Sequence, residues 1–196
     1  MHYILDVFHQ LFHSYRQVNT RRIIRRVQAG LQVLKLMISR DNEGDDMAGL
    51  YFEDFEVGQT FQHGWSRTVT EMDNMLFSCL TLNVQPLHID AEFASKTEFG
   101  KPVVNSLFTL GLLVGITVND TTLGTTVANL GLQHVTFPKP VFQGDTIRAR
   151  TTVATVRPSG SRPNAGLVEF EHIATKQTGE IVCRCTRTAM MHRRPA

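Results

Sequence analysis

The chain has 196 residues, 42% of them hydrophobic, which is enough for one substantial buried core with an appended segment. Its 20 Lys and Arg residues against 18 Asp and Glu give a formal net charge of +2, too weak a field to indicate nucleic-acid binding. No run reaches the roughly 18 uninterrupted apolar residues of a membrane span, and the Cys and His spacings match no zinc site. The three cysteines, Cys79, Cys183 and Cys185, cannot all pair, so we interpret them as reduced thiols of a cytoplasmic protein.

The first 46 residues differ in composition from the rest of the chain. Apolar residues recur at roughly helical spacing between Ile23 and Leu36 among arginines, which predicts an amphipathic basic helix. Such an extension is typical of a mitochondrial transit segment, which would place the protein in the matrix, or of a helix that rests on an anionic surface. The alternative interpretation is that residues 1–46 have no role, because translation starts at Met47, where a globular pattern begins. We favour the alternative and expect a single domain over residues 47–196.

The first part of this domain carries a strand and a short helix. Alternation over residues 60–69 is compatible with a strand. Thr70 then offers a hydroxyl N-cap three residues before Asp73, so a short helix is expected through Leu80.

A polar turn around Pro86 separates that helix from two others. Proline prevents helical continuation, and Asp90 is placed to cap a further short helix through Lys96. Residues 105–119 then form a stretch that is apolar nearly all round, which indicates a buried helix.

After Gly124 the pattern changes to period two and to β-branched residues, which predicts four more strands. The expected strands cover residues 125–137, 145–157, 167–176 and 180–191. Helices first and strands afterwards indicate an α+β fold, in which one face of an antiparallel five-stranded sheet covers the apolar helix. Such a sheet leaves an edge exposed, so we expect a homodimer in which two edges pair across a twofold axis.

The segment from Asn83 to Asp90 holds two amides and an imidazole just before the apolar helix. Addition of water to a double bond conjugated to a thioester needs a base, an acid and donors for the enolate oxygen. His88 suits the acid/base role because imidazole changes charge near neutral pH, and the amide of Asn83 suits a water-holding role. The unpaired first-turn N–H groups of the apolar helix, near Asn105 and Ser106, suit the enolate oxygen.

The stretch from Asn83 to Ser106 resembles the MaoC-like hydratase family, which contains the (R)-specific enoyl-CoA hydratases. The family motif runs Asp-x-Asn-Pro-x-His-x-Asp, followed after a short helix by Phe and a Pro-Val-x-x-Gly segment. The pattern Thr-x-Asn-x-Gln-Pro-Leu-His also resembles a subgroup associated with short, branched or dicarboxylic acyl-CoAs such as mesaconyl-CoA. Weaker similarity covers nearly everything after Met47. The residues that match the motif are Pro86, Leu87, His88, Asp90, Phe93, Ala94, Phe99, Pro102 and Val103.

The resemblance implies a hot-dog fold, an antiparallel sheet wrapped around a long central helix, paired as a dimer with active sites near the subunit interface. It also implies a hydro-lyase that needs no metal or redox cofactor and takes coenzyme A as part of its acyl-thioester substrate. It gives His88 the acid/base role and the N–H of Ser106 the role of oxyanion donor. Gln85, Pro86 and Asn105 are expected to bind the substrate.

Two positions depart from the family pattern. Ser106 replaces a Gly, a change that keeps the backbone N–H. Asn83 stands where the family has its catalytic Asp, and an amide cannot accept a proton from water as a carboxylate does. Either His88 is then the sole base while Asn83 positions the water, or the chain binds thioesters without hydrating them. A thioesterase on the same fold, in which water attacks the carbonyl instead of the alkene, is a third interpretation.

A dicarboxylic acyl group would need a cation, and coenzyme A carries phosphates that a basic loop would meet. The expected reaction is reversible hydration of a short-chain enoyl-CoA, and Arg162 is retained as a substrate-binding residue. For each cation the alternative is an ordinary surface charge. The candidates are Arg67, Lys101 and Arg162 for the carboxylate, and Lys139, Arg157 and Arg162 for the phosphates.

Overall fold

The computed structural model describes residues 49–195, so the basic helix expected over residues 1–46 lies outside the described residues. After η1, which was not predicted, the described elements follow the predicted order: one strand, short helices, a long helix and four further strands. In chain order they are η1 (Phe52–Asp54), β1 (Thr60–Thr68), α2 (Glu71–Leu80), α3 (Pro86–Ile89), α4 (Ala91–Ser95), α5 (Ser106–Thr121), β2 (Thr126–Thr136), β3 (Thr146–Pro158), β4 (Ala165–Thr175) and β5 (Ile181–His192).

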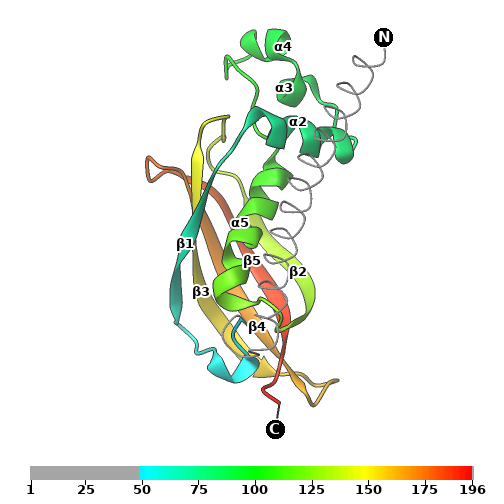
Figure 1. Ribbon diagram of the computed structural model, residues 1–196, viewed down its shortest axis with the longest axis vertical. Coiled ribbons are helices and arrows are strands. Elements are labelled where there is room, and N and C mark those ends of the chain that lie inside the picture. Colours follow the sequence, from blue (N-terminus) through cyan, green and yellow to red (C-terminus); the bar gives the residue numbers. More distant parts are fainter. Residues whose placement is uncertain (1–48, 196) are drawn as a thin grey trace, which may run out of the picture. The chain divides into compact units, whose positions relative to one another are not determined.

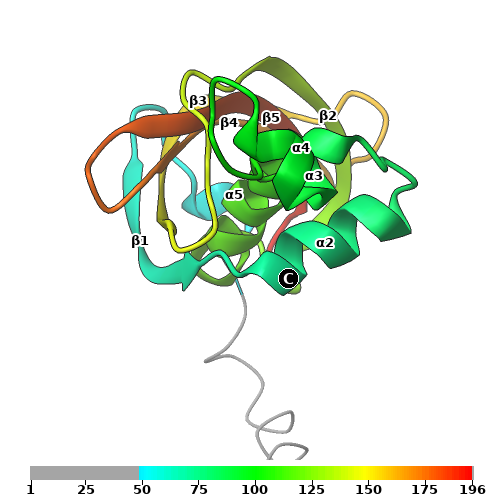
Figure 2. The ribbon, with the colours of Figure 1, turned by 90° about the horizontal axis from the view of Figure 1, so that it is seen from above.

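The five strands form one antiparallel sheet in the order β1-β3-β4-β5-β2. The sheet curves from β1 on one side to β2 on the other, with α5 inside the curve (Figure 1, Figure 2). The predicted α+β fold, an antiparallel sheet around a long helix, is therefore confirmed. β1 and β2 are the edge strands, and α2, α3 and α4 gather at the end where α5 begins (Figure 1).

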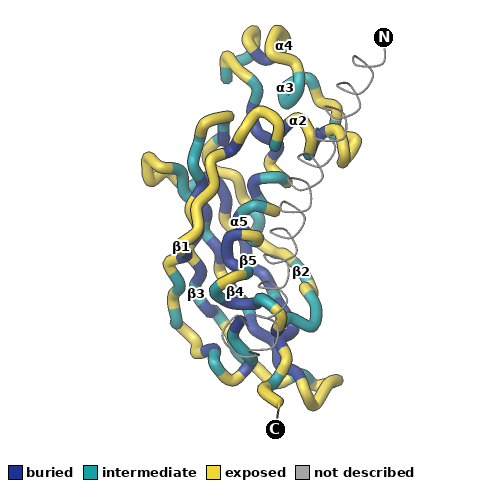
Figure 3. Tube along the Cα trace, viewed as in Figure 1, coloured by how far each residue is buried: buried dark blue, intermediate teal, exposed yellow. Residues whose placement is uncertain are grey.

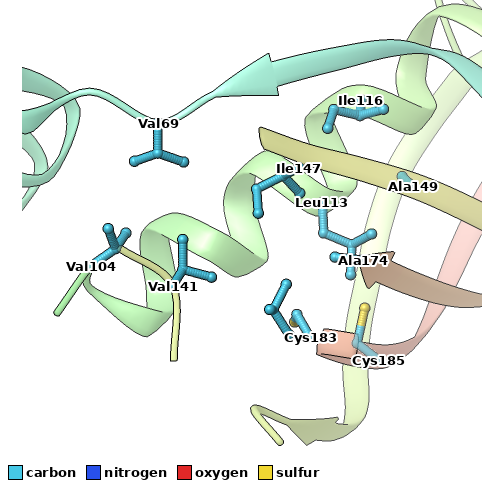
Figure 4. Packing of buried hydrophobic residues seen from close by; sticks show 11 residues of the cluster. Val69, Val104, Leu113, Ile116, Val141, Ile147, Ala149, Ala174, Cys183 and Cys185 are labelled. Atoms are coloured by element: carbon cyan, nitrogen blue, oxygen red, sulfur yellow. The ribbon is translucent and has the colours of Figure 1, made fainter. Parts of the chain in front are cut away.

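The face of α5 that meets the sheet packs into the main core (Figure 3). Leu113 has no exposed surface and lies among side chains from β3, β4 and β5 (Figure 4). Full burial of a leucine side chain contributes roughly 2 kcal/mol, and alanine and cysteine neighbours let the helix approach the strands closely. Those neighbours include Ala149 of β3, Ala174 of β4, and Cys183 and Cys185 of β5, which are free thiols.

The N-terminus of α2 is capped as the sequence predicts. Thr70 Oγ1 accepts the N–H of Asp73 at 3.2 Å, and the Asp73 carboxylate accepts the N–H of Thr70 at 2.8 Å. Arg67 adds an ion pair to Asp73 at 2.7 Å. Burial alone would raise the pKa of Asp73, but the hydrogen bonds from Thr70 and the charge of Arg67 more than offset it and hold that pKa below its usual value.

The segment after α2 differs in one respect from the prediction. Pro86 begins the one-turn helix α3 instead of forming part of a turn. A proline is tolerated at the first helical position, because its missing N–H would have no partner there. Asp90 caps α4 as predicted, since its side chain accepts the N–H of Phe93 at 2.9 Å. Because α3 spans Pro86–Ile89, His88 lies on a short helix.

A chain of polar side chains runs from the last turn of α5 into the sheet. His63 Nδ1 lies 2.8 Å from the Asp120 carboxylate, and its Nε2 lies 2.7 Å from the hydroxyl of Thr151. That hydroxyl also lies 2.8 Å from Nδ1 of the buried His172. Burial, followed by the charges of Arg187 and His63, lowers the pKa of His172 to about 3, so this ring is neutral in the folded protein.

Candidate active site

His88 is held in place through its imidazole ring. It lies on α3, and its Nδ1 atom is 2.8 Å from the carbonyl oxygen of Val103. A carbonyl oxygen only accepts, so Nδ1 carries the proton in this contact. In the neutral ring Nε2 then has a free lone pair, which makes it the nitrogen that can accept a proton from water.

Asn74, a buried amide on α2, ties three segments of the site together. Its Nδ2 donates to the carbonyl oxygens of His88 at 2.8 Å and of Val103 at 3.2 Å. Its Oδ1 accepts the N–H of Asn105 at 2.8 Å. Asn74 therefore holds the backbone of His88, the carbonyl that binds the imidazole and the entrance to α5. Sequence reasoning missed this residue, because the one signal was an asparagine inside a helix, where its propensity is low.

The start of α5 is built by Asn105 and Ser106. Asn105 is the N-cap: its Oδ1 accepts the N–H of Leu107 at 3.0 Å, and its Nδ2 donates to the hydroxyl of Ser78 at 3.3 Å. Its backbone N–H donates to Asn74, so Asn105 has a structural role at the start of α5, and its contact with substrate stays a prediction. Ser106 is the first helical residue, and its N–H has no partner within the helix. That N–H is the donor left for a ligand oxygen.

His88 and Ser106 line the same cavity, named cavity A, of about 290 Å³. The segment between β2 and β3 contributes one wall, a role that sequence reasoning did not assign to it. The candidate acid/base and the candidate oxyanion donor therefore meet in one space. Its apolar lining includes Leu87, Phe99, Val104, Phe137, Val141 and Val182.

A second cavity, named cavity B, has a volume of about 200 Å³ and shares His88 and Val104 with cavity A. The imidazole therefore borders both cavities. The polar side chains that line cavity B are Glu71 and Asn74 of α2, together with Lys101 and Gln143.

Three of the predicted site residues precede His88 in the chain. Asn83 lies in the turn after α2, Gln85 is the N-cap of α3, and Pro86 is its first residue. None of the three is among the described residues that line cavity A or cavity B. The backbone N–H of Asn83 donates to the carbonyl of Ser78 at 2.9 Å, while its half-buried side-chain amide has no hydrogen-bond partner among residues 49–195.

Arg162 lies in the turn between β3 and β4, at the opposite end of the sheet from α3 (Figure 1). β3 starts close to the beginning of α2 and has 13 residues. At about 3.3 Å per residue, such a strand is roughly 40 Å long. Within one chain Arg162 is therefore far from His88, and this geometry does not support the expectation that it binds the acyl substrate.

A third cavity, of about 440 Å³, lies between β1 and α5 and has a mainly apolar lining that includes Trp65 and Leu112. It contains neither His88 nor Ser106, so its larger volume does not make it the site. Within residues 49–195, no group of three or more His, Cys, Asp or Glu side chains is arranged to hold a metal ion. The helices of the described part also include none with the length and hydropathy to cross a membrane.

Comparison with known families gives a match over most of the described chain. The model of the MaoC like domain matches residues 54–175. The chain belongs to the MaoC-like domain family. The matched part of this MaoC-like domain includes α3 with His88, and the start of α5 with Ser106.

Two relatives of this MaoC-like domain are named for related reactions. A mesaconyl-CoA hydratase of Cereibacter sphaeroides is 35% identical over 147 residues, which cover 75% of this chain and 42% of the relative. An (R)-specific enoyl-CoA hydratase of Rhodospirillum rubrum is 29% identical over 151 residues, which cover 75% of this chain and 95% of the relative. The chain therefore spans nearly all of the second relative and about two fifths of the first.

A solved structure identifies the fold of the MaoC-like domain. A Mycobacterium tuberculosis protein described as a double hotdog fold superposes with a TM-score of 0.68 over 75% of this chain and 45% of that chain. Its sequence identity is 23%, so the likeness concerns the fold alone. Together with the sheet order and the central α5, it confirms the predicted hot-dog fold.

Proposed function

We propose that this MaoC-like domain catalyses the reversible addition of water to a short-chain enoyl-CoA thioester. It acts as a hydro-lyase without metal or redox cofactor, and coenzyme A enters as part of the substrate. The observation that carries the proposal is the setting of His88: Val103 holds its Nδ1 proton, and cavity A brings Ser106 into the same space. The names of the mesaconyl-CoA and (R)-specific enoyl-CoA hydratases among its relatives support the same reaction.

In the proposed reaction His88 moves one proton. Its Nε2 removes a proton from water while the water oxygen forms a bond to the β-carbon. The electrons of the double bond move onto the thioester oxygen, and the N–H of Ser106, at the positive end of α5, stabilises the resulting enolate. His88 then gives its proton to the α-carbon, which completes the hydroxyacyl product. The reverse sequence dehydrates that product.

We also propose that Asn83, which lines neither cavity A nor cavity B, positions the attacking water from the turn before α3. Its side-chain amide is half-buried and has no hydrogen-bond partner among the described residues, so it is available to a water molecule. An amide oxygen accepts a hydrogen bond from water without taking the proton. In this assignment Asn83 orients the water and His88 alone removes the proton.

The protein is further proposed to be a homodimer paired through β2. This edge strand presents unpaired backbone groups, and its Leu130 and Leu132 are 51% and 37% exposed. An apolar edge is a template for pairing with a second chain, and a twofold axis pairs the same edge with itself. Light scattering is expected to give twice the chain mass of 22.1 kDa, and Leu130→Lys is expected to shift the protein towards the monomer.

The direct test is an assay of the purified chain with crotonyl-CoA and mesaconyl-CoA. Loss of the enoyl absorbance, abolished by His88→Ala, is the expected result. Release of free thiol without loss of the double bond would instead identify a thioesterase. Binding of the thioesters with neither signal would identify a non-catalytic thioester-binding module, and either of these results would overturn the proposal.

A further inference from the structure

Cavities A and B offer His88 two different chemical environments. Cavity A holds Ser106, whose N–H suits a thioester oxygen, and Lys139, one of the cations considered for the coenzyme A phosphates. Cavity B holds an ammonium group, because Lys101 is the one cation among the described residues of its lining. A substrate that extends into both cavities would therefore place an oxygen near Ser106 in cavity A and a negative charge near Lys101 in cavity B.

Lys101 is available for such a charge. Its Nζ lies 4.4 Å from the ring centroid of Phe142, which holds the ammonium by a cation–π contact. Glu71 lines the same cavity, but among the described residues no carboxylate lies within 4.0 Å of the Lys101 ammonium. Its charge is therefore not neutralised by a close partner in the described chain.

The other two cations considered for a carboxylated acyl group are engaged or distant. Arg67 forms an ion pair with Asp73 at 2.7 Å. Arg162 lies in the β3–β4 turn at the far end of the sheet (Figure 1). Of the three cations considered for a carboxylated acyl group, Lys101 is thus the one that borders a cavity shared with His88.

We infer that Lys101 binds the distal carboxylate of a trans-dicarboxylic enoyl-CoA thioester. A trans double bond directs its two substituents to opposite sides, so the thioester carbonyl lies in cavity A and the carboxylate in cavity B, with the reacting carbons beside His88. The ammonium then gives the carboxylate a charge-assisted hydrogen bond. This inference rests on the proposed hydratase function and adds the substrate class.

The test compares two substrates that differ in one group. Mesaconyl-CoA carries the carboxylate, and 2-methylcrotonyl-CoA carries a methyl group in its place. Lys101→Met keeps the length of the side chain and removes its charge, so kcat/KM for mesaconyl-CoA is expected to fall about 10-fold or more. The value for 2-methylcrotonyl-CoA is expected to change less than about twofold. Lys101→Arg, which keeps the charge, is expected to retain most of the mesaconyl-CoA activity.

Lys96→Met is the matched control. Lys96 carries the same charge five residues earlier, pairs with Glu92 at 2.8 Å and lines neither cavity. The Lys96→Met substitution is expected to leave kcat/KM for both substrates unchanged. The assignment of Lys101 is overturned if Lys101→Met lowers kcat/KM equally for both substrates or for neither. It is also overturned if the wild type hydrates 2-methylcrotonyl-CoA but not mesaconyl-CoA. In these cases the hydratase function stands. A wild type that hydrates neither compound, nor crotonyl-CoA, overturns the function itself and the inference with it.

Discussion

The Nδ1 atom of His88 and the carbonyl oxygen of Val103 are 2.8 Å apart. Val103 lies three residues before the first residue of α5, so this hydrogen bond joins the imidazole to the backbone that leads to Ser106. One contact therefore fixes the tautomer of the ring and its place relative to the start of the helix. The chemistry proposed for the site depends on both.

Replacement of His88 by alanine is expected to lower the rate of hydration by about 10² to 10⁴, since a positioned acid/base contributes on that order. The residue is only partly buried, so the free energy of unfolding should change little. Initial rates with crotonyl-CoA, together with a thermal melt of the same variant, separate the two effects. Retention of full turnover by a folded His88→Ala protein would remove the imidazole from the mechanism.

Replacement of Asn74 by leucine tests the positioning of the imidazole. The variant loses two donated hydrogen bonds and leaves the N–H of Asn105 without its acceptor, which should destabilise the fold by about 2 to 4 kcal/mol. At a temperature where the variant stays folded, kcat for crotonyl-CoA is expected to fall more than KM rises. This substrate has no carboxylate to place in cavity B beside Asn74, so the residue acts here through its hydrogen bonds to the supports of His88. Denaturant titration and steady-state kinetics give the two quantities.

A matched variant tests the two hydrogen bonds that Asn74 donates. Asn74→Asp keeps the volume and the acceptor for the N–H of Asn105 but, as a carboxylate, donates to neither carbonyl. It should therefore lose kcat, and because the buried carboxylate faces the carbonyl oxygens of His88 and Val103, it should be at least as destabilised as Asn74→Leu. Equal kcat in Asn74→Asp and the wild type would show that the two donated bonds serve only the fold.

The elements of the sheet and the long helix were predictable because their residues repeat with a period. Alternation marked the strands, and an apolar surface on all sides marked α5 as buried. The cap of α2 was equally visible, since Thr70 and Asp73 are three residues apart in the chain. Local spacing carries all of these signals.

The remainder of the site depends on contacts between residues far apart in the chain. Asn74 accepts a hydrogen bond from Asn105, which is 31 residues away in the chain, and no local pattern predicts that contact. The predicted oxyanion role was assigned to both Asn105 and Ser106, but only a folded chain shows that Asn74 already occupies the N–H of Asn105. For the same reason, the position of Arg162 at the far end of β3 could not be read from its charge.

Asn83→Asp tests the departure from the family motif. A carboxylate at this position can accept a proton from water, which the amide cannot, so a second base becomes available in the turn before α3. Activity on unbranched crotonyl-CoA is expected to rise relative to activity on mesaconyl-CoA. The ratio of the two kcat/KM values is the measurement, and an unchanged ratio would show that position 83 does not influence the choice of substrate.

The buried His172 should make stability depend on pH. Its pKa of about 3 in the folded protein, set first by burial and then by the charges of Arg187 and His63, lies below the unfolded value of 6.5. Between these values the unfolded chain binds a proton that the folded chain does not, so the free energy of unfolding decreases as pH falls from 6.5 towards 3.

One such proton changes the free energy of unfolding by up to about 1.4 kcal/mol per pH unit. The variant His172→Gln keeps a polar group beside Thr151 and removes the titration, so its stability should fall less steeply than that of the wild type over the same window. Urea denaturation at several pH values between 7 and 4 measures both slopes. Parallel curves for the two proteins would mean that His172 is protonated equally in the folded and unfolded chains, which is incompatible with a neutral buried ring.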